Sequence, residues 1–100
     1  MTNQPKKSID VFGIDDIRPS VMKFALMMET RFRSNDYMSD WDKLCNDDLM
    51  AVLQMQMIDL ANVVELDKQD DIRAESVDLA NFALMLFDNN DLRKTNHFFD

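Results

Sequence analysis

Residues 75–87 read ESVDLANFALMLF, and this stretch decides the fold because its apolar residues recur with the period of a helix. Two acids, Glu75 and Asp78, interrupt the apolar pattern, and Asn81 follows after three more residues. Residues three apart are neighbours on a helix, so these polar side chains form a row. Acids among apolar residues are costly unless something binds them. The row is therefore a candidate binding site.

A matching row precedes it, because Gln56, Asp59 and Asn62 have the same spacing within LQMQMIDLANVV, residues 53–64. Consecutive helices joined by a short turn are usually antiparallel neighbours. We therefore expect the two rows to face each other and to gather three carboxylates and three amides in a dry groove. Oxygen ligands of this kind suit Mg²⁺, Mn²⁺ or Ca²⁺ better than zinc. The alternative is that each row is simply a solvated helix face.

The periodicity predicts an all-α fold in which three main helices form a helical bundle. We expect helices over residues 19–33, 47–65, and from 70 or 71 to 87, with Pro19 in the first turn of the first helix and Asn46 as the N-cap of the second. The run DNNDLRK should end the third helix. The expected organisation is an irregular N-terminal arm (1–17), a helical domain (18–90) and a C-terminal tail (91–100).

The composition suggests that the bundle is completed by oligomerisation. The chain has 100 residues, of which 46% are hydrophobic and nine are Met. A domain of this size buries a modest fraction of its surface, so some of this apolar content should lie between subunits. We therefore expect a homodimer or a higher homo-oligomer.

The net charge and the terminal sequence limit the ligands and the cellular location that we expect for this protein. A net charge of −8 disfavours binding to nucleic acid polymers, although a small phosphorylated ligand fits if a divalent cation bridges it to carboxylates. The single cysteine, Cys45, cannot form an intrachain disulfide. No signal peptide and no apolar run of membrane-spanning length is visible. We therefore expect a cytoplasmic protein that does not contact a membrane.

Residues 19–88 resemble the MazG-like superfamily of all-α nucleoside triphosphate pyrophosphatases, especially small phage-encoded members. The signature of that family is E-x-x-E on one helix and E-x-x-D on the next, and Glu75 and Asp78 match its second half. Phage members often carry a tryptophan between the first two helices, where Trp41 stands. The resemblance implies a dimer in which Mg²⁺ holds a triphosphate and water releases pyrophosphate. A phage-encoded protein would work in the host cytoplasm.

The resemblance also assigns roles to residues. Asp59, Glu75 and Asp78 would be catalytic and would ligate Mg²⁺ or Mn²⁺, and Gln56 would join through its carbonyl or a water. The nucleotide would contact Asn62 and Asn81, with Lys43 and Trp41 as further candidates. A tryptophan in such a position is more often a core anchor than a platform for a base, so Trp41 is also interpreted as an anchor. Other candidate cations for the phosphates are Lys23, Arg31, Arg33 and Arg73.

The first half of the signature departs from the family pattern. Gln56 and Asp59 stand where the family has two glutamates, and the change to Gln56 removes a charge that would attract a metal. The family's basic His-Lys-Gly run is also replaced by residues 37–40. These departures motivate an alternative: a catalytically weakened or inactive MazG-like protein that binds a nucleotide or a host protein partner without hydrolysis.

Overall fold

The computed structural model describes residues 12–35 and 40–91, and these residues form helices and connections with no strand among them. The three long helices are α1 (Pro19–Ser34), α2 (Asn46–Glu65) and α3 (Gln69–Asn89). Two short 3-10 helices, η1 (Ile14–Asp16) and η3 (Trp41–Lys43), precede α1 and α2. The predicted all-α fold with three main helices is confirmed. The predicted arm and tail fall largely on residues 1–11 and 92–100, outside the described residues.

The helix ends differ slightly from those expected, and local hydrogen bonds explain the differences. Helix α2 begins at Asn46 itself, with Cys45 as the N-cap, and the Cys45 N–H donates to the Asp48 carboxylate at 3.4 Å. Helix α3 continues through Asp88 and Asn89 instead of ending at Phe87. The Asn90 side-chain amide donates to the Leu86 carbonyl at 2.8 Å, so it caps an exposed carbonyl of the last turn.

The turn between α2 and α3 is a complete Schellman motif. The Lys68 N–H donates to the Val63 carbonyl at 3.2 Å, and the Asp67 N–H donates to the Val64 carbonyl at 3.0 Å. Asp67 takes the left-handed position of this motif, with φ 54°, where glycine is the usual residue. The motif reverses the chain within a few residues and sets α3 antiparallel to α2.

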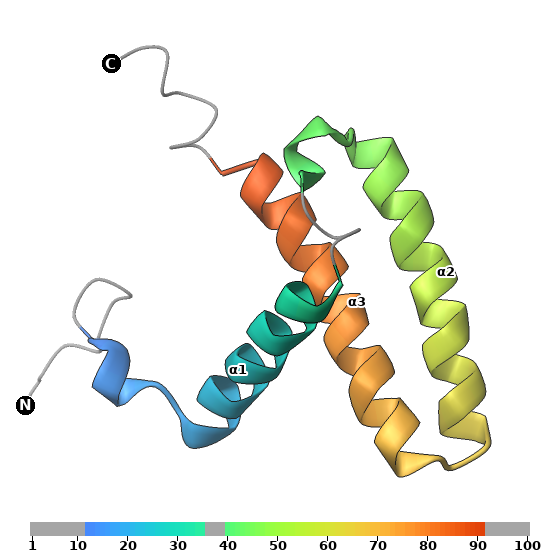
Figure 1. The fold of residues 1–100 in the computed structure, drawn as a ribbon, viewed down its shortest axis with the longest axis horizontal. Coiled ribbons are helices and arrows are strands. Elements are labelled where there is room, and N and C mark those ends of the chain that lie inside the picture. Colours follow the sequence, from blue (N-terminus) through green and yellow to red (C-terminus); the bar gives the residue numbers. More distant parts are fainter. Residues whose placement is uncertain (1–11, 36–39, 92–100) are drawn as a thin grey trace, which may run out of the picture.

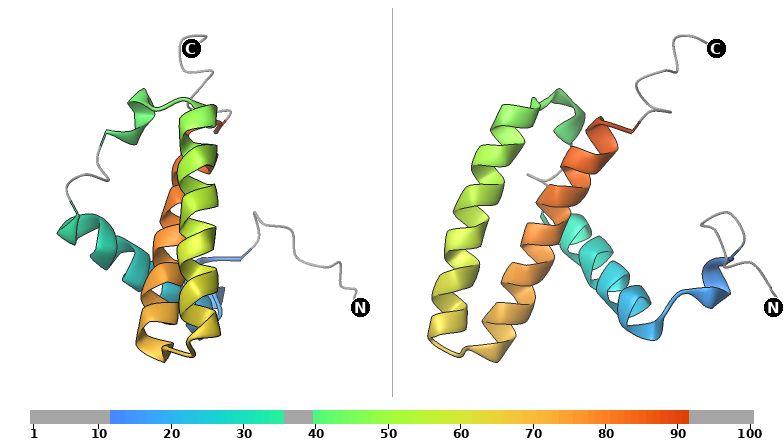
Figure 2. Two further views of the ribbon diagram at one scale, coloured as in Figure 1. Left: turned by 90° about the vertical axis from the view of Figure 1, so that its right-hand side faces the viewer. Right: turned by 180° about the vertical axis from the view of Figure 1, so that it is seen from behind.

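Helices α2 and α3 lie side by side over most of their length, and α1 crosses α3 at an angle (Figure 1). Seen from the side, η3 and the C-terminal end of α1 lie on one side of the α2–α3 pair (Figure 2, left). Leu49 and Met85 form the centre of the core, with Phe32, Trp41, Phe82 and Leu86 packed around them. The core therefore sits where α1, η3 and both long helices meet.

Among the described residues, no helix is both long enough and apolar enough to cross a bilayer.

Candidate functional site

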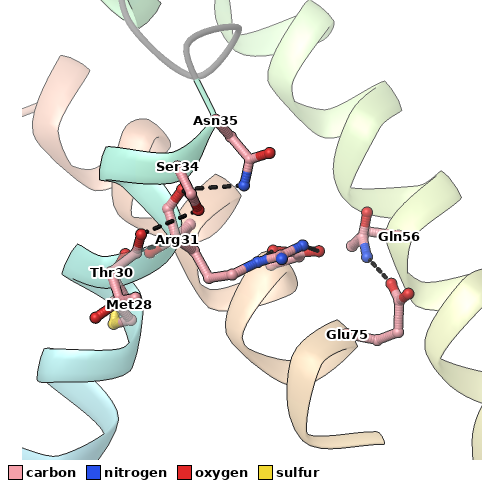
Figure 3. A network of polar contacts seen from close by, with 9 residues as sticks. Met28, Thr30, Arg31, Ser34, Asn35, Gln56 and Glu75 are labelled. Carbon is pink, nitrogen blue, oxygen red and sulfur yellow. Dashed lines mark hydrogen bonds and ion pairs between the residues drawn. The ribbon is translucent and has the colours of Figure 1, made fainter. Parts of the chain in front are cut away.

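The buried acid of α3, Asp78, is held by an arginine of α1. Asp78 is 7% exposed, and the Arg31 guanidinium donates from Nε to Oδ1 at 2.8 Å and from Nη2 to Oδ2 at 2.7 Å. Such two-pronged pairs are strong because both hydrogen bonds are charge-assisted. Figure 3 shows the Arg31 side chain extending from α1 toward α3. The pair compensates the buried charge and fastens α1 to α3.

The other acid of the α3 polar row, Glu75, faces α2 instead. The Gln56 side-chain amide donates to Glu75 Oε1, as Figure 3 shows, and both side chains are half-buried. This contact confirms that the first members of the two polar rows meet across the antiparallel pair. Glu75 and Asp78 therefore belong to one row but contact different helices: Glu75 contacts α2, and Asp78 contacts α1. The reason is geometric: three residues turn a helix by about 300°, so each step along the row rotates it by about 60°.

Asn81 continues this rotation and points into the contact between α1 and α3. It is 0% exposed, and its Nδ2 donates to the Met28 carbonyl at 3.2 Å. Its Oδ1 is buried and has no hydrogen-bond partner among the described residues. A buried amide oxygen of this kind is costly, and a water, an N–H group or a cation would satisfy it.

The remaining members of the α2 row are not gathered into a dry groove. Asp59 and Asn62 are both exposed, because the same rotation carries them away from α3. Within the described part of the chain, no three acidic, histidine or cysteine side chains are placed to hold a metal ion together. The oxygen donors are of the type that Mg²⁺ prefers, and of the six only Gln56 and Glu75 contact each other, whereas Asp78 pairs with Arg31.

Trp41 serves as a structural anchor in η3. Its ring packs against Phe32 with the centroids 5.1 Å apart, and its Nε1 donates to Asp88 Oδ2 at 3.0 Å. The Asn89 side-chain amide also donates to the Trp41 carbonyl at 2.9 Å. Trp41 borders a hollow of about 210 Å³ together with Asp40, Asp42 and Asp88, and three carboxylates there would repel a phosphate. Lys43, the predicted ligand contact beside it, is exposed.

A second region, between α1 and α3, has the opposite electrostatic character. Two adjoining hollows of about 260 and 310 Å³ share Met27, Arg73 and Val77 as lining residues. Lys23 borders one of them and Arg31 borders the other. We call this region the α1–α3 groove. It has an apolar floor and three cations at its edge, although Asp70 also contributes to the lining.

These three cations were predicted from the sequence as candidate phosphate contacts, but their position around one groove was not predicted. The signal was present in α1, where Lys23, Met27 and Arg31 follow one another at intervals of four residues and therefore share a face. The sequence could not show that Arg73 lies beside this face, because Arg73 belongs to α3 and its position relative to α1 depends on how the two helices cross.

Comparison with protein-family models, with curated proteins and with solved structures finds no match for this chain. The fold and the contacts described above therefore support one identification only: a small all-α protein of three packed helices.

Proposed function

We propose that this protein is a divergent MazG-like protein that binds a nucleotide without hydrolysing it. The observation that carries the proposal is that both acids of the α3 polar row are engaged by side chains of the same chain. Glu75 accepts from Gln56, and Asp78 accepts two hydrogen bonds from Arg31. The family resemblance supports a nucleotide as the ligand, and the engaged acids argue against metal-dependent turnover.

Charge compensation supports the absence of a metal. A buried carboxylate needs a positive partner, and Arg31 supplies it to Asp78 at hydrogen-bond distance. A divalent ion at Asp78 would have to displace this two-pronged pair. At Glu75, the neutral amide of Gln56 replaces the second carboxylate that the family signature provides there. Glu75 and Asp78 therefore each have a side-chain partner at the place where a metal ion would bind.

The α1–α3 groove combines cationic side chains with an apolar surface, and these two features could bind a nucleotide in the absence of a metal ion. Arginine and lysine side chains bind phosphate oxygens directly, and Arg73 and Lys23 border this groove beside the Arg31–Asp78 pair. Its floor of Phe24, Met27 and Val77 offers an apolar surface for a base. In a chain of net charge −8, a local gathering of cations is the region to which a phosphate is drawn.

The second candidate is the metal-dependent pyrophosphohydrolase that the resemblance implies. In it, Asp59, Glu75 and Asp78 would hold Mg²⁺ or Mn²⁺, and a triphosphate would be split into a monophosphate and pyrophosphate. One observation favours it: Asn81 Oδ1 is buried without a partner next to Asp78 in the polar row. A divalent cation in this neighbourhood would give that oxygen a positive partner.

Calorimetry with each of the eight common nucleoside triphosphates tests the binding proposal. We expect binding in EDTA, with an affinity that Mg²⁺ changes little. Arg73→Gln should weaken binding about tenfold, which corresponds to one charge-assisted phosphate contact. Arg33→Gln is the matched control, because Arg33 pairs with Glu29 on the exposed side of α1 and should leave the affinity unchanged. An absence of binding for every nucleotide would overturn the proposal in favour of a protein ligand.

Assays of pyrophosphate release separate the two candidates. We expect no release from any nucleotide in Mg²⁺ or Mn²⁺, and release from any of them would favour the hydrolase instead. Gln56→Glu restores the missing charge and should lower the melting temperature, because it sets two carboxylates against each other, and Mg²⁺ should recover the loss. Gln54→Glu, an exposed change on the same helix, should respond to neither. If Mg²⁺ leaves the Gln56→Glu protein unchanged, Gln56 lies outside any metal site.

A further inference from the structure

One of the two hollows in the α1–α3 groove has no acid among the described residues that line it. This hollow, of about 260 Å³, combines an apolar floor with two cations and two hydroxyl groups, from Lys23, Arg73, Ser20 and Ser76. The chain has 19 acidic residues and 11 basic ones, so a lining of this kind is a local exception to its charge. We call it the cationic hollow. Figure 1 shows α1 and α3 diverging from their crossing toward the start of α1, and the cationic hollow lies between these diverging parts.

The two cations of the cationic hollow have no ion pair among the described residues. Arg31, at the edge of the adjoining hollow, pairs with Asp78. Lys23 and Arg73 have no such partner within the part of the chain that the structure describes. Lys23 belongs to α1 and Arg73 to α3, so two helices bring uncompensated positive charge to one place. Like charges at one site repel each other, and a bound anion would remove that repulsion.

The start of α1 adds to the positive potential of the cationic hollow. Ser20 lies in the first turn of α1, which contains no acid and has no side-chain cap. The N–H groups at the start of a helix carry partial positive charge and attract anions, including phosphate. The hydroxyl groups of Ser20 and Ser76 are further hydrogen-bond donors. Cations, hydroxyl groups and a helix start together form a set of donors that suits a phosphate group.

The adjoining hollow has a different balance of charge. Asp70 contributes to its lining, and Arg31 already pairs with Asp78 there. Among the described residues that line it, the cation without an ion pair is Arg73, which it shares with the cationic hollow. A chain of phosphates that extended from the cationic hollow into this neighbour would therefore meet the carboxylate of Asp70 and no further unpaired cation.

We propose that the cationic hollow selects a nucleoside monophosphate. This inference rests on the proposed function, because it names which nucleotide the α1–α3 groove binds. A phosphomonoester carries about 1.5–2 negative charges near pH 7, and the two positive charges of Lys23 and Arg73 balance them. Each further phosphate adds negative charge. Without a metal ion, this charge would lie in the field of a chain of net charge −8, with Asp70 nearby.

The apolar floor of the cationic hollow provides a surface for the base. Phe24 is 39% exposed, so part of its ring is accessible to a ligand. Every base has a flat face that can stack on an aromatic ring, and such stacking tolerates all of them. A nucleoside monophosphate would therefore use both parts of the lining, with its phosphate at the cations and its base at Phe24. The number of phosphates, more than the identity of the base, should decide the affinity.

Calorimetry in EDTA with adenosine and with its mono-, di- and triphosphates tests the proposal. We expect the monophosphate to bind about tenfold more tightly than the triphosphate, and about a hundredfold more tightly than adenosine, which lacks both phosphate contacts. A triphosphate that binds as tightly as the monophosphate would overturn this inference and leave the proposed function standing, whereas an absence of binding for every nucleotide would overturn both. Ribose 5-phosphate that binds as tightly as the monophosphate would show that the base contributes nothing, and would also overturn the inference.

Charge variants locate the selectivity. Lys23→Gln should weaken binding of adenosine monophosphate about tenfold, and Lys43→Gln in η3 should leave it unchanged. Asp70→Asn removes the acid of the adjoining hollow and should raise the affinity for the triphosphate severalfold, whereas Asp47→Asn at the start of α2 should not. All four side chains are exposed, so the helical circular dichroism should stay the same. Equal effects of the two lysine variants, or a triphosphate affinity that Asp70→Asn does not change, would contradict the proposal.

Discussion

At the scale of single residues, Arg31 both neutralises the buried carboxylate of Asp78 and holds α1 in place. Its side chain is 37% exposed, and that of Asp78 is 10% exposed, so solvent screens the pair only in part. Arg31→Ala would leave a buried acid without its cation. We expect a loss of about 2 kcal/mol in the free energy of unfolding, as measured by urea denaturation.

Arg33→Ala is the control for this prediction. Arg33 pairs with Glu29 on the same helix, and both side chains are mostly solvent-exposed. Such surface pairs contribute little, so the change should stay within about 0.5 kcal/mol. Equal losses in the two variants would mean that the Arg31–Asp78 pair has no special structural role.

The polar rows show how far residue-level reasoning from sequence extends. Spacing alone predicted that Gln56 and Glu75 lie on facing helices, and the hydrogen bond between them confirms it. The same spacing suggested that Asp59 and Asp78 would join them. A row at intervals of three drifts around the helix by about 60° per step, so Asp78 reaches α1 while Asp59 reaches solvent. The crossing of α1 over α3 decides the partner of Asp78, and no local pattern contains that information.

At the scale of elements, the α2–α3 turn carries an evident cost. Asp67 holds a left-handed conformation that residues with a Cβ adopt reluctantly, at the position where a Schellman motif prefers glycine. Asp67→Gly should therefore raise the free energy of unfolding by about 0.5–1 kcal/mol and the melting temperature by a few degrees. Differential scanning calorimetry would detect the shift.

The matched control is Asp71→Gly, in the first turn of α3. There the backbone is helical and the acid suits the positive end of the helix, so glycine should lower the free energy of unfolding by about 0.5 kcal/mol. The two aspartates are four residues apart, and their replacement by glycine should have effects of opposite sign. A loss of stability at both positions would show that the turn tolerates Asp67 without strain.

The helices themselves were the most predictable level of the structure. Apolar periodicity located all three, and the ends moved by at most two residues. The turn was not predicted in detail, because a Schellman motif is normally recognised in a sequence by its glycine, and this motif has Asp67 at that position.

At the scale of the whole molecule, α1 is attached through few contacts. It is joined to α3 by the Arg31–Asp78 pair, by the Asn81–Met28 hydrogen bond and by Phe32 in the core, whereas α2 and α3 adjoin over most of their length. We therefore expect α1 to open locally before the α2–α3 pair unfolds. Hydrogen-exchange mass spectrometry should show faster exchange in α1 than in α3.

Arg31→Ala should enlarge this difference. Exchange should accelerate across residues 19–34 and change much less across α3, because the lost contact belongs to the attachment of α1. A uniform acceleration over all three helices would mean instead that the three helices unfold as one cooperative unit.

Trp41 gives the protein a built-in optical reporter. The single tryptophan of the chain stacks near Phe32 of α1 and donates its indole N–H to Asp88 of α3, so its emission responds to how these two helices are positioned. Separation of α1 from α3 would admit water to the indole and shift its fluorescence to longer wavelength. Titration of an unlabelled sample in a cuvette can therefore reveal any ligand that moves α1.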